Sequence, residues 1–135
     1  MKNRSELRDI IIKVLYQANL YEEANIEYNY TDLIKEQLEV ENEFVDACVN
    51  GIDKNKDKLI DKANKYLKKD WTIDRLSKVD QAILLLGIYE LLYTDTPSVV
   101  AINEAIELSK LYSDDDVRKM INVVLDKVYK EEVNE

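Results

Sequence analysis

Apolar residues recur three or four positions apart along most of the chain. This spacing places side chains on one face of an α-helix. The segments that show it, or that carry a helix-start signal, are 4–21, 31–38, 41–54, 55–68, 97–112 and 113–128. Short polar stretches separate them, so the pattern predicts a series of amphipathic helices joined by short links.

The segment 79–92 is different, because it has no polar side chain between Ala82 and Tyr89. A helix that is apolar on every side is buried, and this one is far shorter than the roughly 20 residues needed to span a bilayer. We therefore expect it to be the central helix of the fold. Within it, Gly87 indicates a helix packed closely against this point. Glu90 is expected to pair with a basic residue or to reach a groove edge, and we assign it a role in partner binding.

Together these segments predict an all-α protein of about seven helices, arranged as two small helical bundles around the central helix. We expect a single domain over 1–135, with an N-terminal bundle at about 1–70 and a C-terminal bundle at about 71–130. The chain has only two glycines and one proline, far fewer than average usage. This scarcity of turn residues argues against strands and hairpins.

The composition excludes several kinds of catalytic or metal site. The chain has no histidine and one cysteine, so it lacks Ser-His-Asp and Cys-His catalysis and any zinc site of Cys and His ligands. Its two glycines are 36 residues apart, which excludes a glycine-rich phosphate loop. The segment 53–64 begins like a calcium-binding loop, but Lys58 replaces the required glycine and Asn64 the bidentate glutamate. We expect no enzyme activity, cofactor or metal.

Charge is distributed unevenly along the chain. Residues 17–53 contain ten acidic residues and one lysine, whereas 54–78 contain nine basic residues and four aspartates, and 1–16 are also basic. Such basic blocks can form a local site for nucleic-acid phosphates on an acidic protein. They can equally keep helix faces solvated, so charge alone leaves both interpretations open.

Residues at the helix junctions also allow predictions. Trp71 is expected to pack between helices, and a stacking platform for a base is the alternative. Ser77 is expected to cap the central helix and Ser113 the last helix. Acidic residues 114–116 lie near the start of that last helix, where they complement its dipole.

The order of several motifs resembles the NusB family of bacterial transcription antitermination factors. R-x-x-I-I-x-V-L-Y-Q occurs near the start and Y-E-L-L ends the central helix; P-x-V-V-A-I-N-E-A-I-E-L-S-K and R-K-M-I-N-V-V-L-D-K-V follow. The resemblance covers essentially the whole chain. Its most specific parts are 100–110 and 122–126.

The resemblance implies a NusB-like helical fold and an RNA-binding transcription antitermination factor. Such a protein recognises single-stranded boxA RNA of ribosomal RNA operons together with NusE, a small-subunit ribosomal protein. It implies indirect association with other antitermination factors and RNA polymerase, a cytoplasmic location and no membrane, and it leaves a homodimer open. By their match to family positions, the expected RNA-binding residues are Lys2, Arg4, Arg8, Tyr16, Arg118, Lys119, Met120 and Asn122. Arg4 and Arg8 are four apart and lie away from the apolar face of 4–21, so we expect them to be neighbours on its exposed side.

The chain departs from the family pattern at four positions. Ser5 and Glu6 occupy places where basic residues are common, and Met120 and Val123 replace a phenylalanine and a glycine. Loss of an aromatic ring removes a stacking surface, so the sequence predicts weak RNA binding alone and stronger binding with the ribosomal partner. A helical protein–protein adaptor without RNA binding is the alternative. An RNA-modifying enzyme is not expected, because no cofactor domain follows.

Overall fold

The computed structural model describes residues 2–133, and every regular element in that range is helical. Its contacts divide the chain into two compact units, Met1–Lys54 and Asn55–Glu135. The all-α class predicted from the hydrophobic spacing is confirmed.

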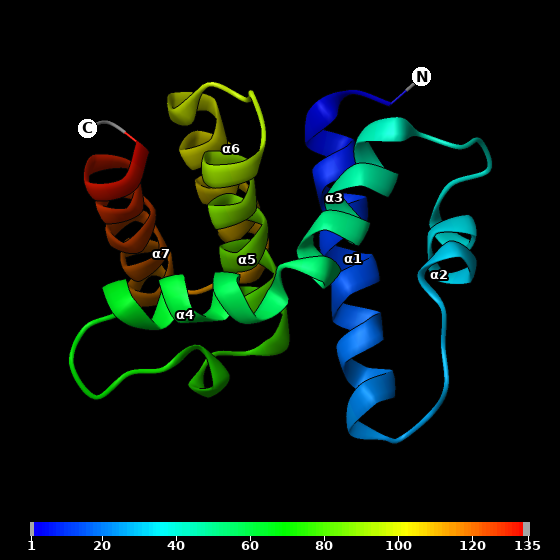
Figure 1. Ribbon diagram of the computed structural model, residues 1–135, viewed down its shortest axis with the longest axis horizontal. Helices are drawn as coiled ribbons and strands as arrows, with labels where there is room; N and C mark the ends of the chain where they lie inside the picture. The colour runs from blue at the N-terminus through cyan, green and yellow to red at the C-terminus, as the bar shows by residue number, and fades with distance from the viewer. Residues whose placement is uncertain (1, 134–135) are drawn as a thin grey trace. The chain divides into compact units, whose positions relative to one another are not determined.

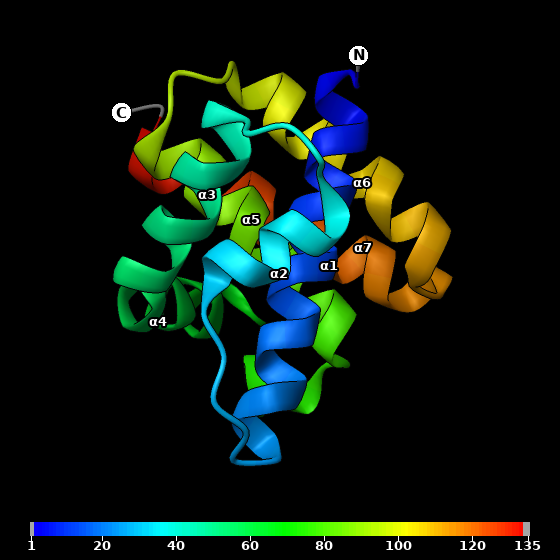
Figure 2. The ribbon, with the colours of Figure 1, turned by 90° about the vertical axis from the view of Figure 1, so that its right-hand side faces the viewer.

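The first unit is built from α1 (Arg4–Glu23), α2 (Tyr30–Gln37) and α3 (Glu43–Lys54), with α1 packed against both other helices (Figure 2). Asn3 and Glu6 form a capping box at the start of α1. The Asn3 side chain accepts a hydrogen bond from the Glu6 amide at 2.8 Å, and the Asn3 amide donates to the Glu6 carboxylate at 3.1 Å. The core of this unit includes Ile11, Val14, Leu33, Val45, Val49 and Ile52.

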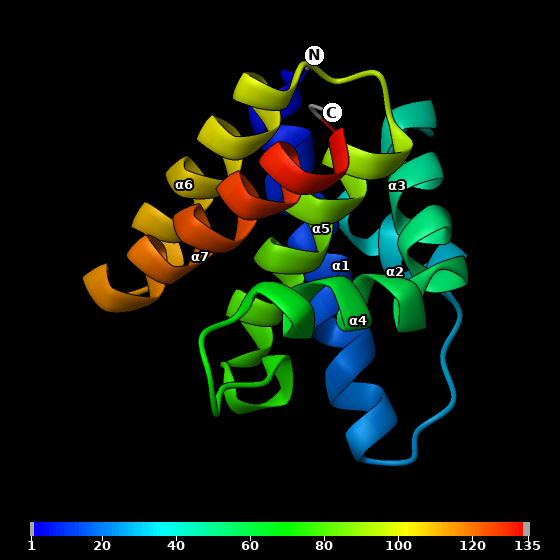
Figure 3. The same ribbon diagram turned by 60° about the vertical axis from the view of Figure 1, so that its left-hand side comes forward.

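The second unit contains α4 (Lys56–Tyr66), η1 (Ile73–Arg75), α5 (Lys78–Tyr93), α6 (Ser98–Tyr112), α7 (Asp115–Val128) and η2 (Tyr129–Val133). Helix α5 packs against α4, α6, α7 and η2 (Figure 1), and α6 runs beside α7 (Figure 3). Every residue from Ala82 to Leu91 is buried, so the expected buried helix is confirmed. Ser77 caps it as predicted, accepting a hydrogen bond from the Asp80 amide at 3.1 Å.

The division between the units differs from the expected bundle boundary near residue 70. It falls between Lys54 and Asn55, because α4 packs against α5 and α7 and buries Leu59, Ala63 and Tyr66 in the second unit. The first unit has a core of its own. Helix α5 is the centre of the second unit, where it packs against α4, α6, α7 and η2.

Gly87 of α5 lies directly against the side chain of Leu125 on α7. A Cβ atom at this position would lie only 2.9 Å from Cδ1 of Leu125 on α7, well inside van der Waals contact. The expectation that a neighbouring helix packs against Gly87 is confirmed. The absence of a side chain is what lets the two helices approach at this point.

Glu90 is buried and forms hydrogen bonds in the turn between α5 and α6. Its carboxylate accepts a hydrogen bond from Thr96 Oγ1 at 3.1 Å, and its carbonyl accepts one from Thr94 Oγ1 at 2.8 Å. Only 1% of Glu90 is exposed. The structure thus gives this residue an internal role, and its contact with a partner protein stays a prediction.

The start of α7 differs from the prediction by one residue. Asp114, rather than Ser113, is the N-cap, and its carboxylate accepts a hydrogen bond from the Val117 amide at 2.9 Å. Ser113 ends α6, and its hydroxyl donates to the buried carboxylate of Asp80 at the start of α5. The serine hydroxyl is engaged by Asp80, and the next side chain caps α7.

Glu132 connects η2 to α4 through two polar contacts. Its carboxylate accepts a hydrogen bond from the Tyr66 hydroxyl at 2.7 Å and lies 2.5 Å from Lys62 Nζ. Burial alone would raise the pKa of Glu132, but the bonds from Lys62 and Tyr66 outweigh it and lower the pKa below its usual value. Burial and the bond to Glu132 raise the pKa of Tyr66 to about 12. At neutral pH Glu132 is therefore ionised and Tyr66 is protonated, so the Tyr66 hydroxyl can donate its hydrogen bond to the carboxylate.

We expect Glu132→Gln to reduce the free energy of unfolding at pH 7 by about 1–2 kcal/mol, because it weakens two hydrogen bonds to a charged group. A carboxyl with a lowered folded-state pKa contributes stability above its unfolded pKa and loses it as pH falls. The difference between wild type and variant should therefore shrink below about pH 4. Urea titrations at several pH values measure this, with the exposed Glu131→Gln as control. A difference that persists undiminished in acid would contradict the assignment.

Candidate nucleic-acid interface

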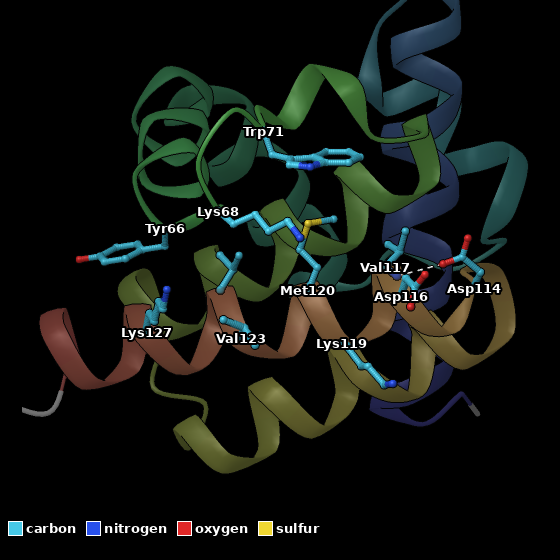
Figure 4. Close-up of a pocket in the computed structure, with 11 residues that line it drawn as sticks. Tyr66, Lys68, Trp71, Asp114, Asp116, Val117, Lys119, Met120, Val123 and Lys127 are labelled. Atoms are coloured by element: carbon cyan, nitrogen blue, oxygen red, sulfur yellow. Dashed lines mark hydrogen bonds between the residues drawn. The ribbon is translucent and has the colours of Figure 1, made fainter.

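A hollow of about 640 Å³ lies in the second unit between α7 and the segment that follows α4 (Figure 4). We call it the α7 hollow. Seven of its residues lie on α7, and an eighth is the N-cap Asp114. The other three come from the end of α4 and the segment after it, which form the opposite wall. The lining residues are Tyr66, Lys68, Trp71, Asp114, Asp116, Val117, Lys119, Met120, Val123, Val124 and Lys127.

The α7 hollow combines an aromatic and aliphatic surface with positive charge. Trp71 is 36% exposed, so part of its indole is accessible, and the exposed Val123 lines the same hollow. Lys68, Lys119 and Lys127 are exposed, and within residues 2–133 none of the three forms an ion pair with a carboxylate. An apolar surface bordered by available cations can stack a base while holding phosphates.

The two ends of the hollow differ in charge. Asp114 and Asp116 lie at the start of α7, whereas Lys127 lies near its end. Carboxylates repel phosphates, and ammonium groups attract them. A nucleic-acid backbone in this hollow should therefore follow the lysines and turn away from the first turn of α7.

Only two of the four expected α7 contacts line the hollow. Lys119 and Met120 do, whereas Arg118 and Asn122 do not. Arg118 and Asn122 are four apart and share a helix face, and neither of them lines the hollow. Arg118 also forms an ion pair with Asp115 at 2.6 Å. The four residues are thus divided between the hollow and the rest of α7.

The start of α1 carries the cationic residues expected on the first unit, but not all of them are exposed. Lys2 and Arg4 are exposed, and the Arg4 guanidinium lies 3.9 Å from the ring centroid of Phe44 on α3. Arg8 is only 3% exposed, with its guanidinium 5.4 Å from the same centroid. The prediction that Arg8 lies on an exposed side is wrong, because α3 brings Phe44 against this part of α1. Tyr16 is 37% exposed.

Sequence reasoning missed two lysines of the hollow. Lys127 shares a helix face with Lys119, Met120 and Val123, so helical spacing could have identified it. Lys68 lies about fifty residues away along the chain, and only the packing of α4 against α7 brings it there. Trp71, for which junction packing was expected, lines the hollow with part of its ring exposed.

The fold of the described residues is that of an all-helical protein of two compact units. The model of the NusB family matches residues 5–130, and the chain belongs to this family. It is 36% identical to the transcription antitermination protein NusB of Pediococcus pentosaceus over 95% of this chain and 98% of that protein. This family consists of transcription antitermination factors, not enzymes.

Solved structures are similar over nearly the whole chain. T. maritima NusB superposes with a TM-score of 0.83 at 32% identity, over 96% of this chain and 92% of that chain. A structure of the antitermination factors NusB and NusE in complex with dsRNA gives a TM-score of 0.78 at 25% identity, over 94% and 96% of the two chains. These similarities confirm the NusB-like fold expected from the motifs.

In residues 2–133, no helix has both the length and the apolar character required to cross a membrane.

Proposed function

We propose that this protein is an RNA-binding transcription antitermination factor that holds single-stranded RNA of the boxA type in the α7 hollow. The observation that carries the proposal is the combination of Trp71 with Lys68, Lys119 and Lys127 around one hollow. Family membership supports the antitermination role, and the similar NusB–NusE–dsRNA structure supports RNA and NusE as partners.

In this proposal the hollow separates two tasks. The three lysines hold phosphates, a contact that gives affinity without reading sequence. Trp71 and Met120 supply the surface against which an unstacked base lies. Trp71 thus provides an aromatic ring to a hollow in which Met120 replaces the family's phenylalanine.

Lys2 and Arg4 form a second cationic surface, on the first unit. Phe44 orients the Arg4 guanidinium through a cation–π contact, and the guanidinium of the buried Arg8 lies 5.4 Å from the centroid of the same ring. We propose that this surface also contacts RNA phosphates. NusE strengthens binding, and the protein acts in the cytoplasm on nascent transcripts.

The test is fluorescence anisotropy of a short labelled boxA-type RNA, with and without NusE, over a range of salt concentrations. We expect salt-dependent binding that NusE strengthens. Replacing Lys68, Lys119 and Lys127 by glutamine should lower the slope of log affinity against log salt by about 2, because single-stranded contacts contribute about 0.7 each.

The matched control replaces Lys35, Lys110 and Lys130 by glutamine, which removes the same charge away from the hollow. If both triple variants lower the slope equally, the hollow is not the phosphate site. If no salt-dependent RNA binding occurs with or without NusE, the protein–protein adaptor becomes the better assignment.

A further inference from the structure

The first unit has a surface whose charge is opposite to that of the α7 hollow. Helix α2 runs between two hollows of about 450 and 550 Å³, which share no residue. The smaller hollow is lined by the N-cap of α2, residue 29, and by residues 32, 33 and 36 of the helix. The larger hollow is lined by residues 31, 34 and 35. Because i, i+3 and i+4 positions share a helix face, the two hollows lie on opposite flanks of α2.

The rings of Tyr21 and Tyr28 line the smaller hollow, and Tyr30 packs next to them. Tyr21 and Tyr28 are stacked with centroids 6.1 Å apart, and Tyr30 meets Tyr28 edge-on at 5.4 Å. The Tyr28 hydroxyl donates to Glu22 and the Tyr30 hydroxyl to Asp53 at 3.4 Å. Burial first, and then the bond to Glu22, raises the pKa of Tyr28, so its ring stays neutral at physiological pH. Neutral rings held in this way offer electron-rich faces to a cation.

Carboxylates and exposed aliphatic side chains border both hollows. Glu27 and Glu36 line the smaller one, together with Ile26, which is 52% exposed. Glu39 and Glu41 line the larger one, together with Val40, which is 77% exposed. Lys35 is the sole basic residue in 17–53 against ten acidic residues. The surface therefore repels phosphates and is complementary to positive charge that carries some apolar character.

We propose that α2 and its two flanking hollows form a docking surface for a segment of a protein partner rich in arginine and lysine. Guanidinium and ammonium groups of the segment meet the glutamates and the face of Tyr28, and its aliphatic side chains cover Ile26 and Val40. Two hollows on opposite flanks of one helix suit an extended or helical polypeptide that crosses α2. Exposed branched side chains beside each hollow favour a polypeptide over a small polyamine, which has no side chains to bury.

This surface does not depend on the RNA-binding proposal. It uses other residues, lies within the first unit and attracts the opposite charge. A variant that loses peptide binding here should retain RNA binding, so the failure of one proposal can be distinguished from the failure of the other.

The probe is a short fluorescein-labelled peptide of alternating arginine and leucine, titrated with the full chain at low and moderate salt. We expect saturable binding that weakens as salt rises. Replacing Glu27, Glu36 and Glu41 by glutamine should weaken it about tenfold. The matched variant with Asp95→Asn, Glu107→Gln and Glu131→Gln, all in the second unit, removes the same charge and should bind almost as the wild type does.

Two further measurements test whether the surface binds a peptide rather than a small polyamine. Tyr28→Leu should weaken peptide binding about two- to fivefold through loss of the ring, whereas Tyr28→Phe should retain it. Spermidine should displace the peptide only at far higher concentration. Equal loss in both charge variants would show that net charge alone attracts the peptide and would overturn the proposal. Displacement by spermidine at the peptide's own concentration, or no saturable binding, would also overturn it.

Discussion

Replacing Trp71 by alanine should lower the affinity for short single-stranded RNA roughly 5- to 150-fold, because base stacking on an aromatic side chain contributes about 1–3 kcal/mol. Trp71 is the aromatic side chain of the α7 hollow with substantial exposure, since Tyr66 is 95% buried. The salt dependence of binding should change little, because no phosphate contact is lost. Fluorescence anisotropy of a labelled RNA at two salt concentrations measures both quantities.

Two substitutions make this test specific to stacking. Trp71→Phe keeps a ring at the same position and should retain most of the affinity. Met120→Phe places an aromatic ring in the hollow and should restore part of the binding lost in Trp71→Ala. A Trp71→Phe variant as weak as Trp71→Ala would contradict stacking, as would an unchanged affinity in Trp71→Ala. Thermal denaturation followed by circular dichroism checks that each variant is folded.

Stacking at Trp71 also bears on the weak binding that the sequence predicts. The replacement of an aromatic residue at Met120 removes a ring from α7, but Trp71 brings one to the opposite wall of the same hollow. The loss of a ring at Met120 could be predicted from the sequence. The presence of Trp71 in the same hollow could not be predicted, because α7 and the segment after α4 meet only through tertiary packing.

The elements that could be predicted are those whose signals are local. Helical spacing defined each helix to within a few residues, and the apolar segment 79–92 predicted the buried α5. The capping role of Ser77 follows from the residues beside it. Local signals of this kind depend on backbone geometry, which is the same wherever a helix packs.

The predictions that failed depend on how distant segments pack. Arg8 looked exposed because it lies beside Arg4 on the polar side of α1, but Phe44 of α3 covers it. Ser113 was expected to cap α7, but its hydroxyl donates a hydrogen bond to Asp80, 33 residues earlier in the chain.

Replacing Gly87 by valine should lower the free energy of unfolding of the second unit by about 1–3 kcal/mol, the usual cost of overpacking a core. Leu125 is fully buried, so its side chain has no solvent-filled space into which it can move. This cost should exceed the gain in helix propensity over glycine, which is below about 1 kcal/mol. Urea denaturation followed by the fluorescence of Trp71, the chain's single tryptophan, reports on the unit that contains both residues.

A double-mutant cycle with Leu125→Ala separates this clash from a general intolerance of α5 to substitution. Leu125→Ala alone should cost about 2–5 kcal/mol through the cavity that it leaves. In the double variant the valine methyl groups occupy part of that cavity, so the combined cost should fall below the sum by about 0.5–3 kcal/mol. Strict additivity would show that Gly87→Val acts through something other than its contact with Leu125. A favourable coupling would instead establish that the close approach of α5 and α7 requires a residue without a side chain at position 87.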